Sequence, residues 1–180
     1  MGKEPQPKPF PRLDDTIGQR AVEVGLITAL PYVVGAIGMI IWGWHSDATG
    51  ERKYHTVIPL AIIVVSLMLA AIMLTPTLKL LCLCFAGFGI FALRPVFWTL
   101  PTAFLSGTGA AAGIAAINSI GNLGGFFGPK VFGLLKDYTG GDVASLIFLA
   151  SAAVIAAVIV LVLGHDPALE KPAFGAANGG

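Results

Sequence analysis

Charged residues are scarce in this sequence. Only 12% of its 180 residues are Asp, Glu, Lys or Arg, whereas about a quarter of a soluble domain is charged. The net charge of +1 leaves no concentrated basic surface, so we expect no nucleic acid partner. The charges form four groups: before Gly25, between His45 and His55, from Lys130 to Asp142, and after Gly164. Long apolar stretches separate these groups.

Cysteine is rare and familiar catalytic motifs are missing. Cys82 and Cys84 stand two positions apart in an apolar run, on different sides of a helix, unlike a CxxC metal or redox pair. His45, His55 and His165 lie at expected water-facing ends without ligand-like spacing. The sequence has no Gly-x-Ser-x-Gly, His-Glu-x-x-His or phosphate-binding loop. We therefore expect no metal, no cofactor and no enzymatic activity.

Five apolar segments occupy most of the chain. A bilayer core about 30 Å thick needs about 20 helical residues, because unpaired backbone groups cannot face lipid. No segment alternates with a period of two, as membrane β-strands do. Short connections force neighbouring helices to run antiparallel. The sequence therefore predicts an all-α, multi-pass helix bundle in a lipid bilayer, with transmembrane helices at about residues 24–44, 56–75, 80–100, 109–135 and 143–164.

The two ends of the chain differ from these segments. Residues 1–23 contain four prolines and several basic residues, without the short apolar core of a signal peptide, so we expect a disordered or aberrant leader. Residues 165–180 are rich in Ala, Gly and Pro, and we expect a disordered tail. Basic residues in the connections are balanced between the two sides, and the basic leader favours an inside N-terminus.

The connection after the first segment has a recognisable pattern. Gly43, Asp47, Gly50, Arg52 and Lys53 fit G-x-x-x-D-x-x-G-x-R-K. The glycines allow a tight turn, and Asp47 and Arg52 can pair with each other or with helix ends. An ordinary charged loop is the alternative. The pattern resembles the loop signature found once in each half of major facilitator superfamily transporters, where it helps to set the conformational equilibrium.

Two further segments, Phe97 to Pro101 and Ile117 to Pro129, resemble the tenth and eleventh helices of the anion:cation symporter branch of that superfamily. Members of this branch transport organic anions, such as hydroxy and sugar acids, together with protons. The similarity covers residues 24–164, which correspond to helices eight to twelve of a twelve-helix fold. It implies the C-terminal part of a secondary transporter, multi-pass in the bacterial inner membrane. The membrane topology of that family places Asp47 in the cytoplasm and the N-terminal tail outside. The basic residues of the leader instead favour an inside N-terminus, so the two indications disagree.

Two amides in the fourth segment are candidate binding groups. Asn118 and Asn122 are four residues apart and project from one helix face. The resemblance implies that Asn118 donates to a carboxylate or hydroxyl of a bound anion, and hydrogen bonding between helices is the alternative. Gly121, Gly125 and Gly128 follow beside that face in the small-residue pattern that lets membrane helices approach closely.

Three further residues complete the candidate substrate site. Trp98 resembles a tryptophan that lines the central cavity in this branch, and Arg94 lies one helical turn before it. An intramembrane arginine is costly, so Arg94 would either attract an anion or stack on Trp98. It lies six residues from Leu100, so its side chain could instead snorkel to the interface. Tyr32 fits either a cavity wall or a packing position.

The expected spans contain no Asp or Glu. Proton coupling in this branch is associated with carboxylates of the first half, so we expect protons to act only in the complete transporter. Alternating access needs two six-helix halves, and five helices cannot form both. The N-terminal half is therefore an expected partner. The competing hypothesis is a non-transporting, truncated membrane protein or subunit that binds other helices.

Overall fold

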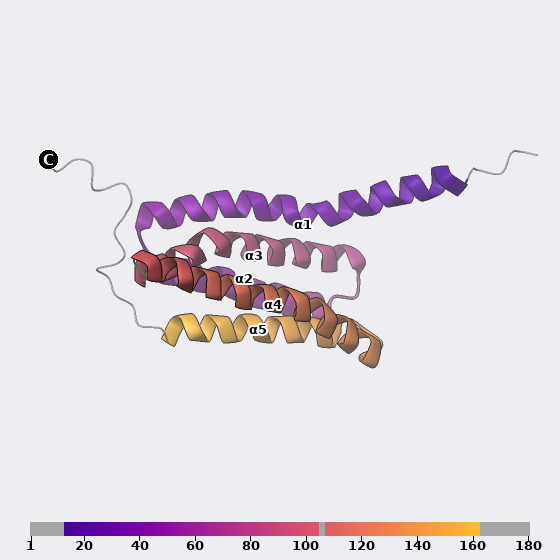
Figure 1. Ribbon diagram of the computed structural model, residues 1–180. Helices are drawn as coiled ribbons and strands as arrows, with labels where there is room; N and C mark the ends of the chain where they lie inside the picture. Colours follow the sequence, from indigo (N-terminus) through magenta and orange to yellow (C-terminus); the bar gives the residue numbers. More distant parts are fainter. Residues whose placement is uncertain (1–12, 105–106, 163–180) are drawn as a thin grey trace, which may run out of the picture. The chain divides into compact units, whose positions relative to one another are not determined.

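The computed structural model describes residues 13–104 and 107–162, and within them the side chains of residues 18–100 and 109–162. All regular secondary structure in these ranges is helical. Each of the five helices is long and apolar enough to cross a membrane, which confirms the expected all-α bundle. The helices in Figure 1 are α1 (Leu13–Thr49), α2 (Lys53–Ile72), α3 (Pro76–Phe104), α4 (Gly107–Thr139) and α5 (Val143–Val162).

The helices extend further than the apolar segments indicated. Helix α1 begins at Leu13, within the expected leader, and continues through most of the loop motif to Thr49. Helix α4 continues to Thr139. Hydropathy marks only the part of a helix that matches the bilayer core, whereas a helix ends where the backbone turns. Gly50 and Gly140 provide those turns with φ of 70° and 71°. The expected tail, residues 165–180, lies outside the described residues.

The chain divides into two compact units, one up to Leu30 and one from Pro31 onward. In the first unit, the Thr28 hydroxyl donates to the carbonyl of Val24 at 2.8 Å and of Gly25 at 3.0 Å, and so is satisfied by its own helix. The second unit contains the remainder of α1 and helices α2 to α5, and all packing described below lies within it.

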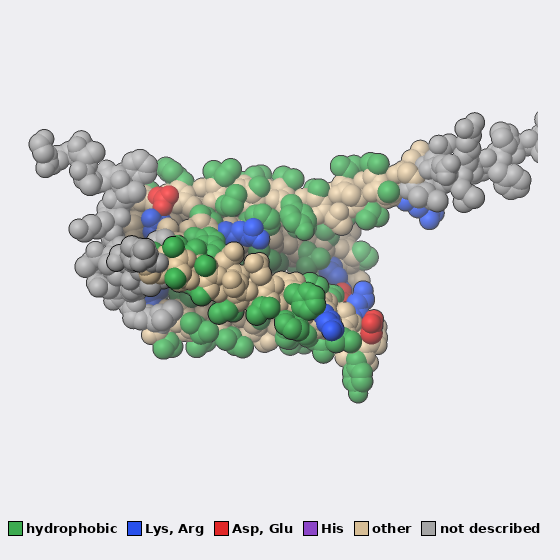
Figure 2. Space-filling view, viewed as in Figure 1, with side chains coloured by type: hydrophobic (Ala, Val, Ile, Leu, Met, Phe, Trp, Pro, Cys, Tyr) green, Lys and Arg blue, Asp and Glu red, His purple; other side chains and the backbone are tan. Residues whose placement is uncertain are grey.

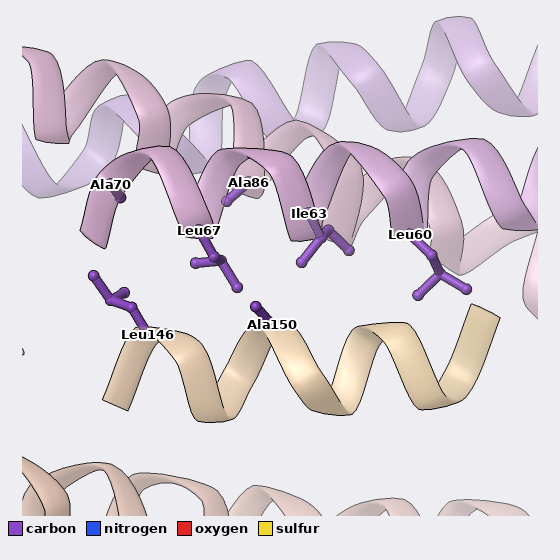
Figure 3. Close-up of a cluster of buried hydrophobic side chains, with 7 residues drawn as sticks. All are labelled: Leu60, Ile63, Leu67, Ala70, Ala86, Leu146 and Ala150. Atoms are coloured by element: carbon purple, nitrogen blue, oxygen red, sulfur yellow. The ribbon is translucent and has the colours of Figure 1, made fainter. Parts of the chain in front are cut away.

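Helix α2 is the centre of the buried core. Its residues Leu60, Ile63 and Leu67 face α5, where Leu146 and Ala150 meet them (Figure 3). Their spacing of three and four residues places them on one helical face. Among the described residues, the buried cluster has contributions from α2, α3 and α5 and consists of Leu60, Ile63, Leu67, Ala70, Ala86, Leu146 and Ala150.

Glycines allow α1 and α3 to approach closely. A β-carbon at Gly35 or Gly38 would overlap the ring of Phe91 or Phe88, respectively. A β-carbon at Gly87 would lie 2.7 Å from the Pro31 carbonyl oxygen. In membranes, small residues favour helix association because they let backbones approach each other.

Helix α4 lacks such contacts along most of its length. Residues 118–127 are all exposed. At the glycines that predicted close approach, Gly121, Gly125 and Gly128, a β-carbon would have no atom of another described element within 4 Å. On the face of the molecule in Figure 2, hydrophobic side chains cover much of the surface and charged ones are few.

Candidate functional site

The loop motif forms a short, well-bonded connection. Residues 50–52 link α1 to α2, and the amide of the buried Gly50 donates to the Ser46 carbonyl at 3.0 Å, which closes the last turn of α1. Gly43 lies inside α1, where a β-carbon would be 3.3 Å from Pro95 of α3. Lys53 is the first residue of α2 and is half-buried.

Arg52 joins the two sides of this connection. Its Nη1 donates to Asp47 Oδ1 at 2.7 Å and to Ser46 Oγ at 2.9 Å. Ser46 is fully buried, and its hydroxyl donates to the Glu51 carbonyl at 3.1 Å. The Arg52 side chain is only 16% exposed but that of Asp47 is 48% exposed, so water still reaches the carboxylate and partly screens the pair. Of the two arrangements that the sequence allowed, Asp47 and Arg52 pair with each other.

A histidine pair lies beside this ion pair. His45 Nδ1 and His55 Nε2 are 2.7 Å apart, and His55 Nδ1 lies 2.8 Å from Glu51 Oε2. Trp42 packs against both rings, and its Nε1 donates to the His55 carbonyl at 2.8 Å. Within the described residues, no group of three or more His, Cys, Asp or Glu side chains is arranged to bind a metal.

Glu51 receives three hydrogen bonds in this cluster. Partial burial opposes its ionisation, but the backbone amides of Tyr54 and His55 and the His55 ring outweigh that cost and lower the pKa of the carboxyl below its ordinary value. Glu51 is therefore ionised at neutral pH and acts only as an acceptor toward His55.

In the membrane span, the structure brings Tyr32 and Arg94 together through Phe91. The rings of Tyr32 and Phe91 meet edge to face, with centroids 6.0 Å apart. The Arg94 guanidinium carbon lies 5.0 Å from the Phe91 centroid, within the range of cation–π attraction. Arg94 is exposed, and no carboxylate among the described side chains, residues 18–100 and 109–162, forms a salt bridge with it. Within these ranges, an aromatic face rather than a carboxylate stabilises the positive charge.

The other candidates lie on α3 and α4. Trp98 is 38% exposed and packs edge to face with Phe97, with centroids 5.5 Å apart. Asn118 and Asn122 are exposed on α4. Among the described residues, no hydrogen bond joins either amide to Tyr32 or Arg94.

Two features of the site were not predicted from the sequence. Phe91 lies three residues before Arg94, and this spacing on one helical face was a usable signal. No sequence pattern predicts the contact between His45 and His55. It depends on the conformation of residues 50–52, which reverse the chain direction between α1 and α2.

Helix α3 is linked to the start of α5 by a third ion pair. Lys79 Nζ lies 2.8 Å from Asp142 Oδ2 and 3.1 Å from Oδ1, joining α3 to the residues between α4 and α5. The hydrogen bond from Lys79 holds the pKa of the Asp142 carboxyl below its ordinary value, against a smaller opposing effect of burial.

This pair predicts a pH-dependent stability. A carboxyl whose pKa is lower in the folded state stabilises the protein above its unfolded pKa, and this contribution disappears as the pH falls through the folded pKa. Lowering the pH from about 6 to about 3 should therefore reduce the melting temperature of the unchanged chain more than that of Asp142→Asn. The matched control is Asp137→Asn. Asp137 lies near the C-terminal end of α4, close in sequence to Asp142, and its carboxylate forms no ion pair with the described residues. An equal response of the unchanged chain and Asp142→Asn would contradict the prediction.

Comparison with known sequences identifies the family. The sequence profile of the Major Facilitator Superfamily matches residues 10–179, nearly the whole chain. The chain belongs to the major facilitator superfamily. Members of this superfamily are membrane transporters, and the five spanning helices agree with a multi-pass membrane location. No solved structure matched the chain.

Several curated superfamily members are similar to the chain. A protein of Agrobacterium vitis named as a candidate tartrate transporter is 42% identical over 87% of the chain. A quinolone resistance transporter of Acinetobacter baumannii is 41% identical over 74% of it, and the inner membrane transport protein RhmT of Escherichia coli (strain K12) is 37% identical over 77%. The chain spans about a third of the length of these relatives, namely 35%, 31% and 32%.

Proposed function

We propose that this chain is the C-terminal part of a proton-coupled secondary transporter for small organic anions of the hydroxy or sugar acid type, located in the bacterial inner membrane. The transported molecule is not altered covalently, so no catalytic group is required. The location is supported by the name of RhmT, and the substrate class by the name of the Agrobacterium relative. The quinolone relative shows that names alone do not settle a substrate, so the anion must be argued from the residues.

The observation on which this proposal depends is Arg94. A charged side chain in a membrane span is expensive and is retained at ion or substrate sites. Arg94 is exposed, is positioned by Phe91, and forms no salt bridge with a described carboxylate. Its guanidinium has five donors in a fork that fits a carboxylate. A carboxylate of the substrate would therefore supply the negative charge that this position lacks.

The remaining candidates would complete the site. Trp98 and Tyr32 offer aromatic surfaces, and Asn118 and Asn122 offer amides that donate to a carboxylate or hydroxyl. Asp47 and Arg52 would act at the loop, where their ion pair fixes the connection between α1 and α2 and so affects the conformational equilibrium. Protons would act through carboxylates of the complete transporter.

The test is uptake by a chimera in liposomes. The chimera joins the N-terminal part of the Agrobacterium relative to this chain, which corresponds to about a third of that protein's length. With an inward proton gradient, we expect accumulation of radiolabelled tartrate or a related hydroxy acid, and loss of accumulation when an ionophore dissipates the gradient. Asn118→Ala and Trp98→Ala should each reduce uptake. Undiminished uptake in both variants would refute the site assignment, and uptake of neutral solutes alone would refute the substrate class.

Helix α4 favours a second candidate function, binding of other membrane helices without transport. Polar amides and open glycines on a spanning helix are features of helix interfaces. The described residues 118–127 are all exposed, and Gly121 and Gly124 have open space where a side chain would be. The purified chain alone should then fail to accumulate anions, whereas a crosslinker at Asn122→Cys should capture a second membrane protein. Anion uptake by the chain without a partner would contradict this alternative.

A further inference from the structure

The contacts of the histidine pair determine which ring nitrogens of His45 and His55 carry protons. His55 is 7% exposed, and both of its ring nitrogens are engaged, Nδ1 with Glu51 at 2.8 Å and Nε2 with His45 Nδ1 at 2.7 Å. Ionised Glu51 is an acceptor only, so His55 Nδ1 must hold a proton and donate it. The short contact between the two rings also requires one proton between the two nitrogens, because two lone pairs at this distance repel each other.

These requirements limit the number of protons in the pair. With both rings neutral, His45 Nδ1 donates to His55 Nε2. When one proton is added, it binds His45 Nε2, and the shared proton moves from His45 Nδ1 to His55 Nε2. His55 then holds protons on both nitrogens and donates to His45 Nδ1 and to Glu51. Every hydrogen bond survives in this state. A second added proton would place an N–H on each of the two facing nitrogens, and this state cannot exist with the rings in contact.

We propose that His45 and His55, together with Glu51, form a proton-binding site that accepts one proton while the loop is closed and a second only when the two rings separate. His45 is exposed and provides entry from water, whereas His55 is buried and is stabilised in its charged form by the Glu51 carboxylate. Separation of the rings would release the α1 end from the start of α2, next to the Asp47 and Arg52 pair. The site does not depend on the proposed transport of anions.

Among the residues that the structure describes, few other charges face this site. From the connection and α2, Arg52 is engaged with Asp47, and Lys53 and Tyr54 belong to the first turn of α2. From α3, the apolar ring of Phe88 packs on Trp42. The two charged residues of α3, Lys79 and Arg94, are engaged elsewhere, with Asp142 and with Phe91. The described part of α5, Val143–Val162, contains no ionisable residue. The ionisable residues of α4 are confined to positions 130–138, near the connection to α5.

Trp42 is a built-in reporter for this site. Its ring centroid lies 5.3 Å from that of His55 and 6.2 Å from that of His45, and a protonated imidazole quenches the emission of a neighbouring indole. The 180-residue chain with Trp44→Phe and Trp98→Phe retains Trp42 alone, because the sequence contains three tryptophans. In nanodiscs, its emission should fall in two steps as the pH is lowered, and the second step should include a red shift as the rings separate.

Three substitutions test the proton count. Glu51→Gln keeps the shape but removes the charge, and should move the first step to lower pH because the protonated pair loses its carboxylate partner. His45→Asn keeps a polar group near the Nδ1 position but cannot gain a proton, and should abolish the second step. Asp47→Asn is the matched control, because it removes a carboxylate of the same loop that pairs with Arg52 instead of a histidine ring. It should shift the first step by less than Glu51→Gln does.

The proposal fails if Glu51→Gln leaves the first midpoint unchanged, or if both steps persist in His45→Asn. Circular dichroism will show whether each variant retains its helices. If a variant unfolds, nitrogen NMR of the unsubstituted chain provides the test, since a coupling between His45 Nδ1 and His55 Nε2 across one shared proton is expected. Two rings that titrate without coupling would overturn the proposal.

Discussion

Replacing Arg94 with glutamine should lower the uptake of organic anions by the chimera at least about tenfold, mainly through a higher KM. A hydrogen bond to a charged group contributes about 1.5–3 kcal/mol, which corresponds to at least a tenfold change in affinity. The guanidinium lies in a membrane span over the Phe91 ring, where water competes less for the anion. Initial rates over a range of substrate concentrations separate an effect on KM from one on kcat.

Matched variants distinguish attraction of the anion from a structural role of Arg94. Arg94→Lys keeps the positive charge and should retain part of the activity, although lysine lacks the planar fork. Lys130→Gln removes one positive charge from another spanning helix and should leave KM unchanged. Phe91→Leu removes the aromatic face and should have a smaller effect than Arg94→Gln. If Arg94→Gln transports anions with the KM of the unchanged chimera, Arg94 is not the anion site.

The fold could be predicted from the sequence because a bilayer leaves few alternatives. Every backbone group in lipid must be paired within the chain, so a long apolar segment predicts a helix without knowledge of its neighbours. The segment at residues 143–164 contains no charge and corresponds to α5, Val143–Val162. The two ends of α1 could not be predicted in this way, because Leu13 and Thr49 lie in polar sequence, where hydropathy does not distinguish helix from loop.

Contacts between helices could not be predicted from the apolar segments that predict the helices themselves. Periodicity tells which residues share a face of one helix, but the partner face depends on how two helices rotate against each other. The sequence pointed to Gly121, Gly125 and Gly128 as sites of close approach, whereas α1 and α3 make that approach at Gly35 and Gly87. The pairing of Lys79 with Asp142 joins residues 63 positions apart and had no local signal.

Gly89→Ala should destabilise the bundle by about 1–3 kcal/mol, the usual cost of overpacking a close interface. A β-carbon at Gly89 would lie 2.7 Å from both the Pro59 carbonyl oxygen and Ile63 Cγ1 of α2. The carbonyl belongs to the backbone and cannot rotate away, and Ile63 is part of the buried core. Alanine therefore forces α3 away from α2, the helix at the centre of that core.

Gly124→Ala is the matched control for this effect. It adds the same methyl group to another spanning helix, where a β-carbon would meet no atom within 4 Å, and alanine has the higher helix propensity. Unfolding in detergent can be followed with a thiol-reactive dye, because Cys82 and Cys84 are half-buried and react faster once the helices separate. Gly89→Ala should lower the unfolding temperature, while Gly124→Ala should leave it unchanged or raise it. Equal unfolding temperatures for the two variants would mean that α2 and α3 do not pack at Gly89, and the buried core on α2 would then need another arrangement.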